Sequence, residues 1–326
     1  MRSIGEHDAD HEQQRRTAVR VASLIPDWAL RLLACPKCGS ELAIHEHGLI
    51  CLNSHKYPVT NGIPRFVEDD RYASNFALEW RRNARTQYDS AESTESAETF
   101  VAKTGLTEGD LRGKIVLDYG CGSGRFSEVA TRNGARVVGL DISSAVDVAA
   151  ENLRDRPFVG VQGDALSPPF RADAFDVVFS IGVLHHTPDC RRGVKSAARL
   201  VRLGGVIALW LYWKGIRITP VTDIYRLVTT RLPAEAFYAF CEKWVPRIVR
   251  AQRLPLIGWI LRKAIPVSGH QKPAWRVLDT FDWYSPKFQS KHDYRQVEGW
   301  LRAQGFEKVE RLGAPVAVRG IRVRVP

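Results

Sequence analysis

A glycine-rich loop at residues 118–124 is the clearest candidate for ligand-binding chemistry in this sequence. It reads Asp118-Tyr119-Gly120-Cys121-Gly122-Ser123-Gly124 and follows the apolar run Ile115-Val116-Leu117. Glycines permit a tight turn and let a ligand approach the backbone closely. The pattern predicts a buried strand, a turn that can hold a ligand, and a helix that starts near Arg125. Because any sharp strand-to-helix turn could use such a loop, the residues around it must decide whether it binds a ligand.

Acidic residues stand at the ends of three successive predicted strands, at Asp118, Asp141 and Asp164. Asp141 follows the loop by about twenty residues, where a carboxylate can bind both ribose hydroxyls of a nucleoside. Asp164 can accept a hydrogen bond from an adenine amino group. Asp118 would repel a pyrophosphate at the helix N-terminus, and Arg125 replaces the third glycine of a dinucleotide loop. A cationic ligand without phosphates, such as S-adenosylmethionine (SAM), therefore fits better than NAD.

From Gly113 onward, short apolar runs alternate with amphipathic stretches, which predicts a doubly wound parallel sheet. The loop, Gly139-Leu140-Asp141, Gly163-Asp164-Ala165 and Phe175–His186 together resemble the ordered motifs of class I SAM-dependent methyltransferases over residues 110–213. The resemblance implies an α/β fold with a mostly parallel seven-stranded sheet. Leu203 departs from the family's usual Pro-Gly-Gly turn, which affects no catalytic residue. The cofactor-binding residues that it implies are Asp118, Gly120, Cys121, Gly122, Gly124, Asp141, Ile142, Asp164, Ala165 and Ile181.

A cysteine unit precedes this core. Cys35 and Cys38 form a CxxC pair, and Cys51 and His55 follow at a spacing that can complete a tetrahedral zinc site. A redox CxxC is the weaker interpretation because no βαβ unit surrounds this pair. His45 or His47 could replace His55 as the fourth zinc ligand. The unit resembles the Trm112-like zinc-ribbon module, which accompanies or activates methyltransferases. Its spacing is also similar to the N-terminal zinc finger of bacterial 23S rRNA guanine-N1 methyltransferases, which makes RNA a rival substrate.

Charge is divided unevenly along the chain, which has a net charge of +11. Residues 1–190 carry 21 basic and 27 acidic side chains (net −6), whereas residues 191–326 carry 26 and 9 (net +17). Amphipathic helices with basic faces are predicted within residues 214–275. Three interpretations stay open for them: a solvated cap over the substrate pocket, a peripheral membrane surface for an anionic or lipid-like acceptor, or an RNA-binding surface.

The acceptor site is predicted in the aromatic and acidic segment Leu278–Pro286. Asp282 or His292 is the expected general base, and Tyr284 is a further catalytic candidate. The stretches around Arg81 and Arg85 are expected to fold over the cofactor, with Arg81 or Arg85 reaching its carboxylate. The prediction is therefore methyl transfer from SAM to a hydroxyl, amine or carbon of a small or lipid-like, anionic acceptor, with base methylation of rRNA or tRNA as the alternative.

The predicted organisation combines these parts. No apolar run of about 18 residues and no secretory signal is found, and six cysteines suggest thiols and zinc, so a cytoplasmic protein without a transmembrane segment is expected. The predicted units are a flexible leader (1–30), the zinc ribbon (31–67), a helical linker and cofactor lid (68–110), the SAM-binding core (111–213), a helical substrate cap (214–275), and a substrate-wall segment with the final helix and strands (276–326).

Overall fold

The structure is a computed structural model that describes residues 25–46, 48–69, 71–215, 220–255 and 257–324. Most of the predicted leader, residues 1–24, lies outside the described residues. The end of that segment forms helix α2 (Asp27–Leu30), and Ile25 is buried. The ordered N-terminal unit therefore begins several residues earlier than the predicted boundary at residue 31.

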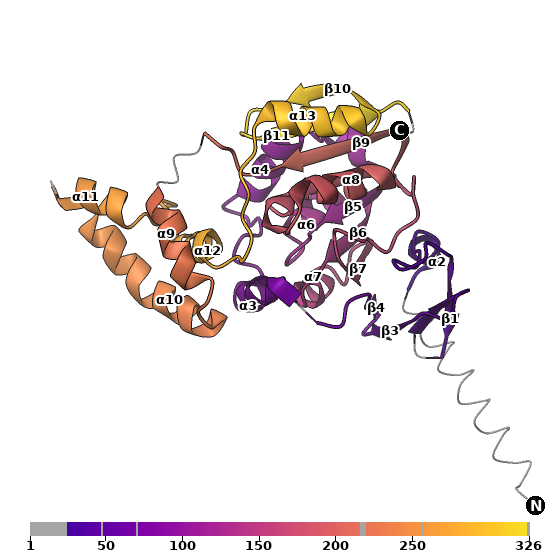
Figure 1. Cartoon of the computed structure of the whole chain (residues 1–326), viewed down its shortest axis with the longest axis horizontal. Helices are drawn as coiled ribbons and strands as arrows, with labels where there is room; N and C mark the ends of the chain where they lie inside the picture. Colours follow the sequence, from indigo (N-terminus) through magenta and orange to yellow (C-terminus); the bar gives the residue numbers. More distant parts are fainter. Residues whose placement is uncertain (1–24, 47, 70, 216–219, 256, 325–326) are drawn as a thin grey trace, which may run out of the picture.

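A seven-stranded sheet forms the centre of the molecule, in the order β10-β11-β9-β8-β5-β6-β7 (Figure 1). Strands β5 to β9 are parallel, whereas β11 pairs antiparallel with β9 and β10 pairs antiparallel with β11. This mostly parallel sheet confirms the predicted fold class. The strands are β5 (Ile115–Tyr119), β6 (Arg136–Asp141), β7 (Phe158–Gln162), β8 (Phe175–Ile181), β9 (Val201–Trp210), β10 (Phe306–Arg311) and β11 (Ala317–Arg322).

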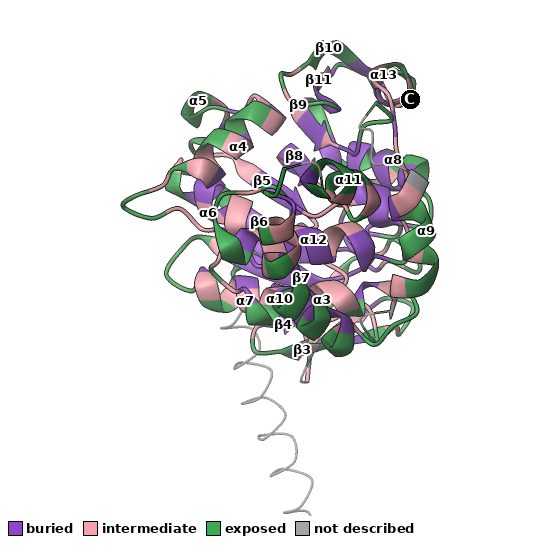
Figure 2. Ribbon diagram, turned by 90° about the vertical axis from the view of Figure 1, so that its left-hand side faces the viewer, coloured by how far each residue is buried: buried purple, intermediate pink, exposed green. Residues whose placement is uncertain are grey.

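Helices cover both faces of the sheet, which is why its central strands are apolar on both sides (Figure 2). Helices α4 and α6 pack on one face through Phe100 and Val129, and α8 and α13 pack on the other through Val194 and Leu301. The short helices α5 and η2 lie in connecting segments. The bounds are α4 (Glu95–Thr104), α5 (Glu108–Leu111), α6 (Arg125–Arg132), α7 (Ala145–Asn152), η2 (Leu184–His186), α8 (Cys190–Leu200) and α13 (Tyr294–Ala303).

The N-terminal cysteine unit is a four-stranded antiparallel sheet that packs beside β7. The amide of Ala34 donates to the carbonyl of Pro169 (3.0 Å), and the amide of Phe66 donates to Gln162 at the end of β7 (2.8 Å). These bonds hold the unit against the core. Its strands are β1 (Leu42–His45), β2 (Gly48–Cys51), β3 (Lys56–Thr60) and β4 (Ile63–Pro64), and η1 (Arg71–Ala73) and α3 (Ser74–Arg82) connect it to the core.

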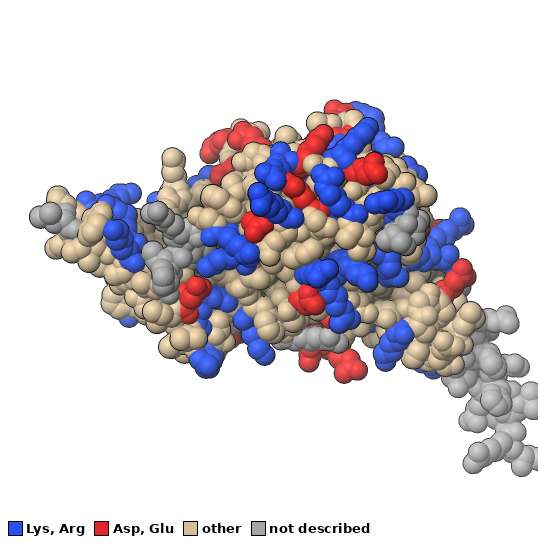
Figure 3. All heavy atoms as spheres, turned by 45° about the horizontal axis from the view of Figure 1, so that its top comes forward, with Lys and Arg blue, Asp and Glu red and all other residues tan. Residues whose placement is uncertain are grey.

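Four helices lie between β9 and α13. Within the predicted cap region are α9 (Pro220–Thr229), α10 (Ala234–Ala251) and α11 (Ile257–Ala264), and α12 (Pro273–Tyr284) follows them. They project from one end of the molecule, and the cysteine unit lies at the opposite end (Figure 1). Lys and Arg side chains are spread over this projecting end and the core (Figure 3). The predicted substrate-wall segment is mostly the helix α12, which packs on α10 and α3 through Phe281 and Leu78. Among the described helices, none is long and apolar enough to cross a membrane.

Candidate active site

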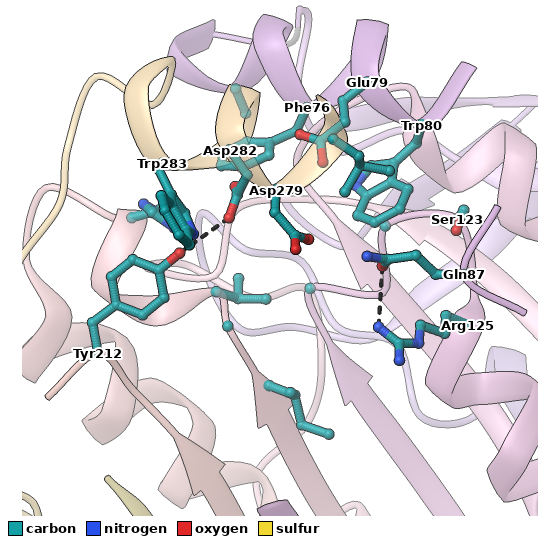
Figure 4. Close-up of a pocket in the computed structure, with 18 of the residues that line it drawn as sticks. Phe76, Glu79, Trp80, Gln87, Ser123, Arg125, Tyr212, Asp279, Asp282 and Trp283 are labelled. Atoms are coloured by element: carbon teal, nitrogen blue, oxygen red, sulfur yellow. Dashed lines mark hydrogen bonds between the residues drawn. The ribbon is translucent and has the colours of Figure 1, made fainter. Parts of the chain in front are cut away.

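A cavity of about 780 Å³ lies at the carboxyl ends of the parallel strands. Its floor comes from the loops after β5, β6, β7 and β8, and its roof comes from α3 and α12 (Figure 4). Ligands of doubly wound sheets bind at this edge, because the loops that follow parallel strands meet there. The sheet topology therefore brings the predicted cofactor loop and the predicted acceptor segment to one cavity.

The glycine loop forms one wall of the cavity through Gly120, Cys121 and Gly122. Gly120 has a φ of 96°, and a Cβ there would lie 2.3 Å from Val183 Cγ1. Gly122 has a φ of 52°, and a Cβ there would lie 2.8 Å from the indole nitrogen of Trp80. Both positions require glycine because a side chain would be strained and would meet a neighbour.

Asp141 lies at the end of β6 and also lines the cavity, together with Ile142. One carboxylate oxygen accepts from the amide of Gly122 (2.9 Å), and the other accepts from the amide and hydroxyl of Ser143 (2.9 and 2.7 Å). These bonds fix the carboxylate between the glycine loop and the next turn. The side chain is therefore already oriented before a ligand enters.

Asp118 and Gly124 lie behind the cavity wall. The Asp118 side chain is buried beneath the loop and accepts from the hydroxyl of Ser127 (2.7 Å). Burial raises the pKa of Asp118 to about 7, although this hydrogen bond opposes the shift. Gly124 precedes α6 with a φ of 88° and packs against Leu153. Asp118 is thus placed to support the loop from below.

The loops after β7 and β8 complete the floor of the cavity. Gly163 and Ala165 line it after β7, and Ile181 lines it after β8. Asp164 accepts from the amide of Leu166 (2.8 Å), which caps the turn next to this wall. Thus the backbone and small side chains around Asp164 form the wall of the cavity at this point.

Arg81 and Arg85 are placed differently from the prediction. Both are exposed and lie outside the cavity wall; Arg85 stacks on the ring of Tyr88 (4.5 Å to the centroid). Instead, α3 turns Glu79 and Trp80 towards the cavity, so a contact between either arginine and a cofactor carboxylate stays a prediction that this geometry does not support. Residues 81 and 85 therefore point away from the ligand space.

Two other basic side chains, Arg125 and Lys103, line the cavity. Arg125 donates to the side chain of Gln87 (3.1 Å) and to the hydroxyl of Ser96 (2.9 Å), and burial lowers its pKa to about 10. Lys103 lies over the ring of Trp210 (3.5 Å from Nζ to the centroid), and burial lowers its pKa to about 7. The wall therefore holds one fixed guanidinium, Arg125, and one amine, Lys103, that is only partly protonated near neutral pH.

Three carboxyl groups lie in the cavity under α3 and α12: Glu79, Asp279 and Asp282 (Figure 4). The hydroxyl of Tyr212 donates to Asp282 (3.0 Å), and burial raises the pKa of Asp282 to about 6. Burial also raises the pKa of Glu79 well above its usual value. One oxygen of Glu79 is buried without a hydrogen-bond partner among the described residues. The group therefore suits a ligand that donates hydrogen bonds.

His292 and Tyr284 do not share this position with Asp282. The His292 ring pairs with the hydroxyl of Ser290 (2.8 Å) and meets the edge of Trp300 (5.1 Å between centroids). The hydroxyl of Tyr284 donates to the carbonyl of Pro266 (2.7 Å) within an apolar cluster between α10 and α12. Neither side chain lines the cavity, so their catalytic role stays a prediction that this geometry does not support.

The four predicted zinc ligands come together in the cysteine unit. The ligand atoms of Cys35, Cys38, Cys51 and His55 lie within 4.8 Å of one another. Sγ of Cys38 and Sγ of Cys51 are 3.7 Å apart, and Nδ1 of His55 lies 3.3 Å from Cys51 and 3.5 Å from Cys35. A tetrahedron with Zn–S bonds of about 2.3 Å has S–S edges of about 3.8 Å. The donor set therefore fits a zinc ion. His45 instead approaches Glu46, and His47 lies outside the described residues.

Several cavity residues were not predicted, and the sequence carried little signal for them. Trp80 and Gln87 lie close in sequence to Arg81 and Arg85, which were predicted to bind the cofactor. Only the rotation of α3 and of the turn after it decides which of these side chains point into the cavity. Tyr212 lies just after β9, at the edge of the sheet where ligands bind. This position could have identified it as a candidate site residue. Lys103 is one residue of an amphipathic helix with no local motif.

Comparison with known proteins agrees with this geometry. A family model described as a methyltransferase domain matches residues 117–209. The ubiquinone biosynthesis O-methyltransferase of Coxiella burnetii is 37% identical over 98 residues, which are 29% of this chain and 42% of that protein. The 27-O-demethylrifamycin SV methyltransferase of Amycolatopsis mediterranei is 32% identical over 152 residues, which are 43% of this chain and 55% of that protein.

A SAM-dependent methyltransferase structure from Mesorhizobium loti is 28% identical, covers 35% of this chain and 52% of its own, and has a TM-score of 0.32. The chain thus spans about half the length of the curated relatives that it matches. The match to the family model is confined to the core and leaves out the cysteine unit and the cap. Residues 117–209 therefore form a methyltransferase domain within a fold of the class I type.

Proposed function

We propose that the protein is a SAM-dependent methyltransferase that binds SAM and its acceptor together in the cavity. The observation that carries the proposal is the pre-oriented Asp141 carboxylate beside the glycine loop, at the edge of the sheet where a nucleoside fits. Asp141 would accept from both ribose hydroxyls, and Gly163 and Ala165 would lie against the adenine. Gly120 and Gly122 leave room for the methionine part of SAM to pass close to the backbone.

The methionine carboxylate of SAM needs a cationic partner. Arg125 supports this role because it is buried on the cavity wall beside the glycine loop and is held by Gln87 and Ser96. Lys103 is the second buried basic side chain on the wall. We assign the carboxylate to Arg125, because a guanidinium that is already fixed loses little freedom when it binds an anion.

Asp282 is the proposed general base. SAM supplies a methyl group that is already electrophilic, so the protein must hold the acceptor in line with it and take up the acceptor's proton. Asp282 lines the cavity, and burial holds its pKa at about 6, so it is ionised near neutral pH. Tyr212 donates to the same carboxylate and would keep it aimed during transfer. A hydroxyl or amine is therefore the expected acceptor group.

The cavity wall does not favour the anionic acceptor that the charge division predicted. Its roof carries Glu79, Asp279 and Asp282, and one buried oxygen of Glu79 has no hydrogen-bond partner among the described residues. Phe76, Trp80 and Trp283 supply apolar contact around these acids (Figure 4). We therefore propose a small-molecule or lipid-like acceptor with an apolar part and with hydroxyl or amine donors.

The zinc ion is proposed as a structural ion held by Cys35, Cys38, Cys51 and His55. The unit around it is small, with few apolar residues to stabilise it alone, and it packs beside β7 rather than over the acceptor space. Zinc would thus stabilise the N-terminal unit and its contact with the core. None of the six cysteines forms a disulfide, which supports a cytoplasmic location as part of this proposal.

Calorimetry tests the cofactor assignment directly. Wild-type protein is titrated with SAM, S-adenosylhomocysteine and NAD, and we expect binding of the first two. Asp141→Ala should weaken SAM binding by more than about a hundredfold, because two hydrogen bonds to a charged acceptor are each worth about 1.5–3 kcal/mol. Arg81→Ala is the matched control on an exposed side chain. Binding of NAD without SAM would overturn the assignment.

Labelled methyl transfer tests the activity. The protein is incubated with methyl-labelled SAM and with separated lipid, small-molecule and RNA fractions of cells, and we expect label in one of the first two. Asp282→Asn should reduce this transfer about a hundredfold or more while SAM binding stays unchanged. Label only in RNA would replace the proposal with the rRNA or tRNA alternative.

A further inference from the structure

Helices α9, α10 and α11 expose an unusual number of large apolar side chains. Trp259 is 58% exposed and Val228 is 63% exposed. On α9 these residues recur at helical spacing on one face, and the three helices are mostly exposed in Figure 2. We call this set the apolar patch: Ile224, Leu227, Val228, Leu232, Phe240, Trp244, Leu254, Ile257, Trp259 and Ile260. Soluble surfaces rarely keep so many apolar side chains in contact with water, so the patch suggests a docking surface.

Cations are interleaved with the patch. Lys243 and Arg247 each lie 5.7 Å from the ring centre of Trp244, and Lys263 lies 3.8 Å from that of Trp259. Residues 220–265 contain eight Lys and Arg and three Asp and Glu. Two of those acids already face cations of other elements: Glu242 pairs with Arg82 and Asp223 with Lys291. The surface is therefore both apolar and positively charged, and Figure 3 shows the Lys and Arg side chains at the projecting end.

We propose that α9, α10 and α11 dock on the surface of a bilayer that contains anionic lipids. Apolar rings would enter the boundary between head groups and acyl chains, while Lys and Arg would face lipid phosphates. Lys243 and Lys263 lie beside the rings that would insert, as this arrangement requires. Charge complementarity thus selects an anionic surface, and the exposed aliphatic residues select lipid.

Other partners fit these helices less well. RNA could use the aromatic rings and the cations, but it offers no apolar partner for Ile224, Leu227 and Val228. A second copy of the chain could cover those residues, but it would bring together two surfaces with an excess of positive charge. The cysteine unit, which an RNA substrate was expected to share with this half, lies at the opposite end of the molecule.

The docking surface adjoins the cavity. Thr222 of α9 and Arg262 of α11 line the cavity, as do Pro266 and Val267 just after α11. A docked protein would therefore hold one wall of its cavity next to lipid. If the proposed function also holds, an acceptor with an apolar tail could pass from the bilayer to Asp282. The docking itself does not depend on that function.

Co-sedimentation with vesicles tests the docking. The full chain is mixed with vesicles of phosphatidylcholine alone, and of phosphatidylcholine with phosphatidylglycerol, at low and high salt. We expect binding to the anionic vesicles that weakens as salt rises. The double variant Trp244→Ser/Trp259→Ser should lower the partition coefficient by roughly tenfold or more, because two rings lose their burial in lipid.

A matched control removes apolar side chains elsewhere on the surface. Leu52 and Leu203 are 86% and 55% exposed, away from the cap, and Leu52→Ser/Leu203→Ser should leave vesicle binding unchanged. Melting temperature and SAM affinity are measured for both double variants and are expected to match the wild type. The SAM measurement reports on the proposed function separately from docking.

Three results would overturn the docking proposal. The first is the absence of binding to anionic vesicles. The second is equal vesicle binding by the wild type and the tryptophan variant. The third is a dimer in analytical ultracentrifugation, or salt-sensitive RNA binding in a filter assay, that the tryptophan variant abolishes while vesicles fail to bind.

Discussion

Asp118→Asn should change how the stability of the protein depends on pH. The Asp118 carboxyl is buried under the glycine loop, and burial raises its pKa to about 7 from an ordinary value of 3.8. Asn has nearly the same shape, and its oxygen can still accept the hydrogen bond from Ser127. The substitution therefore removes the ionisation and keeps the packing and the hydrogen bond.

The sign and size of the effect follow from linkage. Because the folded-state pKa is raised, the stability that Asp118 contributes is fully present below pH 3.8 and is lost as pH rises towards 7. Each unit of pKa difference corresponds to about 1.4 kcal/mol, so the full loss is on the order of 4 kcal/mol. Between pH 5 and pH 8 the free energy of unfolding of the wild type should fall by about 3 kcal/mol because of this group, and that of Asp118→Asn should not.

Denaturant unfolding at several pH values checks this. The free energy of unfolding is measured for wild type and variant between about pH 5 and pH 8, and the difference between them is plotted, since other titrating groups then cancel. The variant should become more stable relative to the wild type as pH rises. Asp155→Asn is the control, because its side chain is 92% exposed. A difference that is flat with pH, or that falls as pH rises, would refute the buried-carboxyl argument.

Three further changes probe other parts of the structure. Gly120→Ala, which would push a Cβ into Val183 at a φ of 96°, should cost about 1–3 kcal/mol of stability and weaken SAM binding, as melting and calorimetry would show. Cys51→Ser should lower the zinc content by mass spectrometry and the melting temperature; unchanged metal content would contradict the site. Arg322→Met should lower the free energy of unfolding by about 1–3 kcal/mol, because the buried guanidinium binds Asp173 and backbone carbonyls; an unchanged denaturation midpoint would argue against this role.

The core of the fold could be predicted from the sequence because its strands are buried on both faces. Such strands appear as continuous apolar runs, and the turns after them place Asp141 and Ile181 at one edge of the sheet. The zinc ligands could be predicted for a similar reason, since short loops fix the spacing of Cys35 and Cys38. In both cases local sequence determines local geometry.

The rest of the cavity depends on how helices are rotated, which local sequence does not determine. In α12, Leu278 and Asp282 lie four residues apart and share the face towards the cavity, together with Asp279. Tyr284 lies on another face and packs against α10. Its composition predicted that the whole segment lines the acceptor site, but helical periodicity turns only some of its residues towards the cavity. The same rotation in α3 turns Trp80 inward and Arg81 outward.

The charge division along the sequence now has a different meaning. If the excess positive charge after residue 190 bound an anionic acceptor, most of its Lys and Arg would have to turn into the cavity. Arg262 does line the cavity, but Lys243, Arg247 and Lys263 lie on exposed faces of α10 and α11. The cavity roof instead carries Glu79, Asp279 and Asp282. The basic residues are therefore available mainly to a partner outside the cap, and the acidic residues to a ligand inside the cavity. The proposed anionic bilayer outside and the proposed hydrogen-bonding acceptor inside would account for both sets at once, which neither an anionic acceptor nor a solvated cap does.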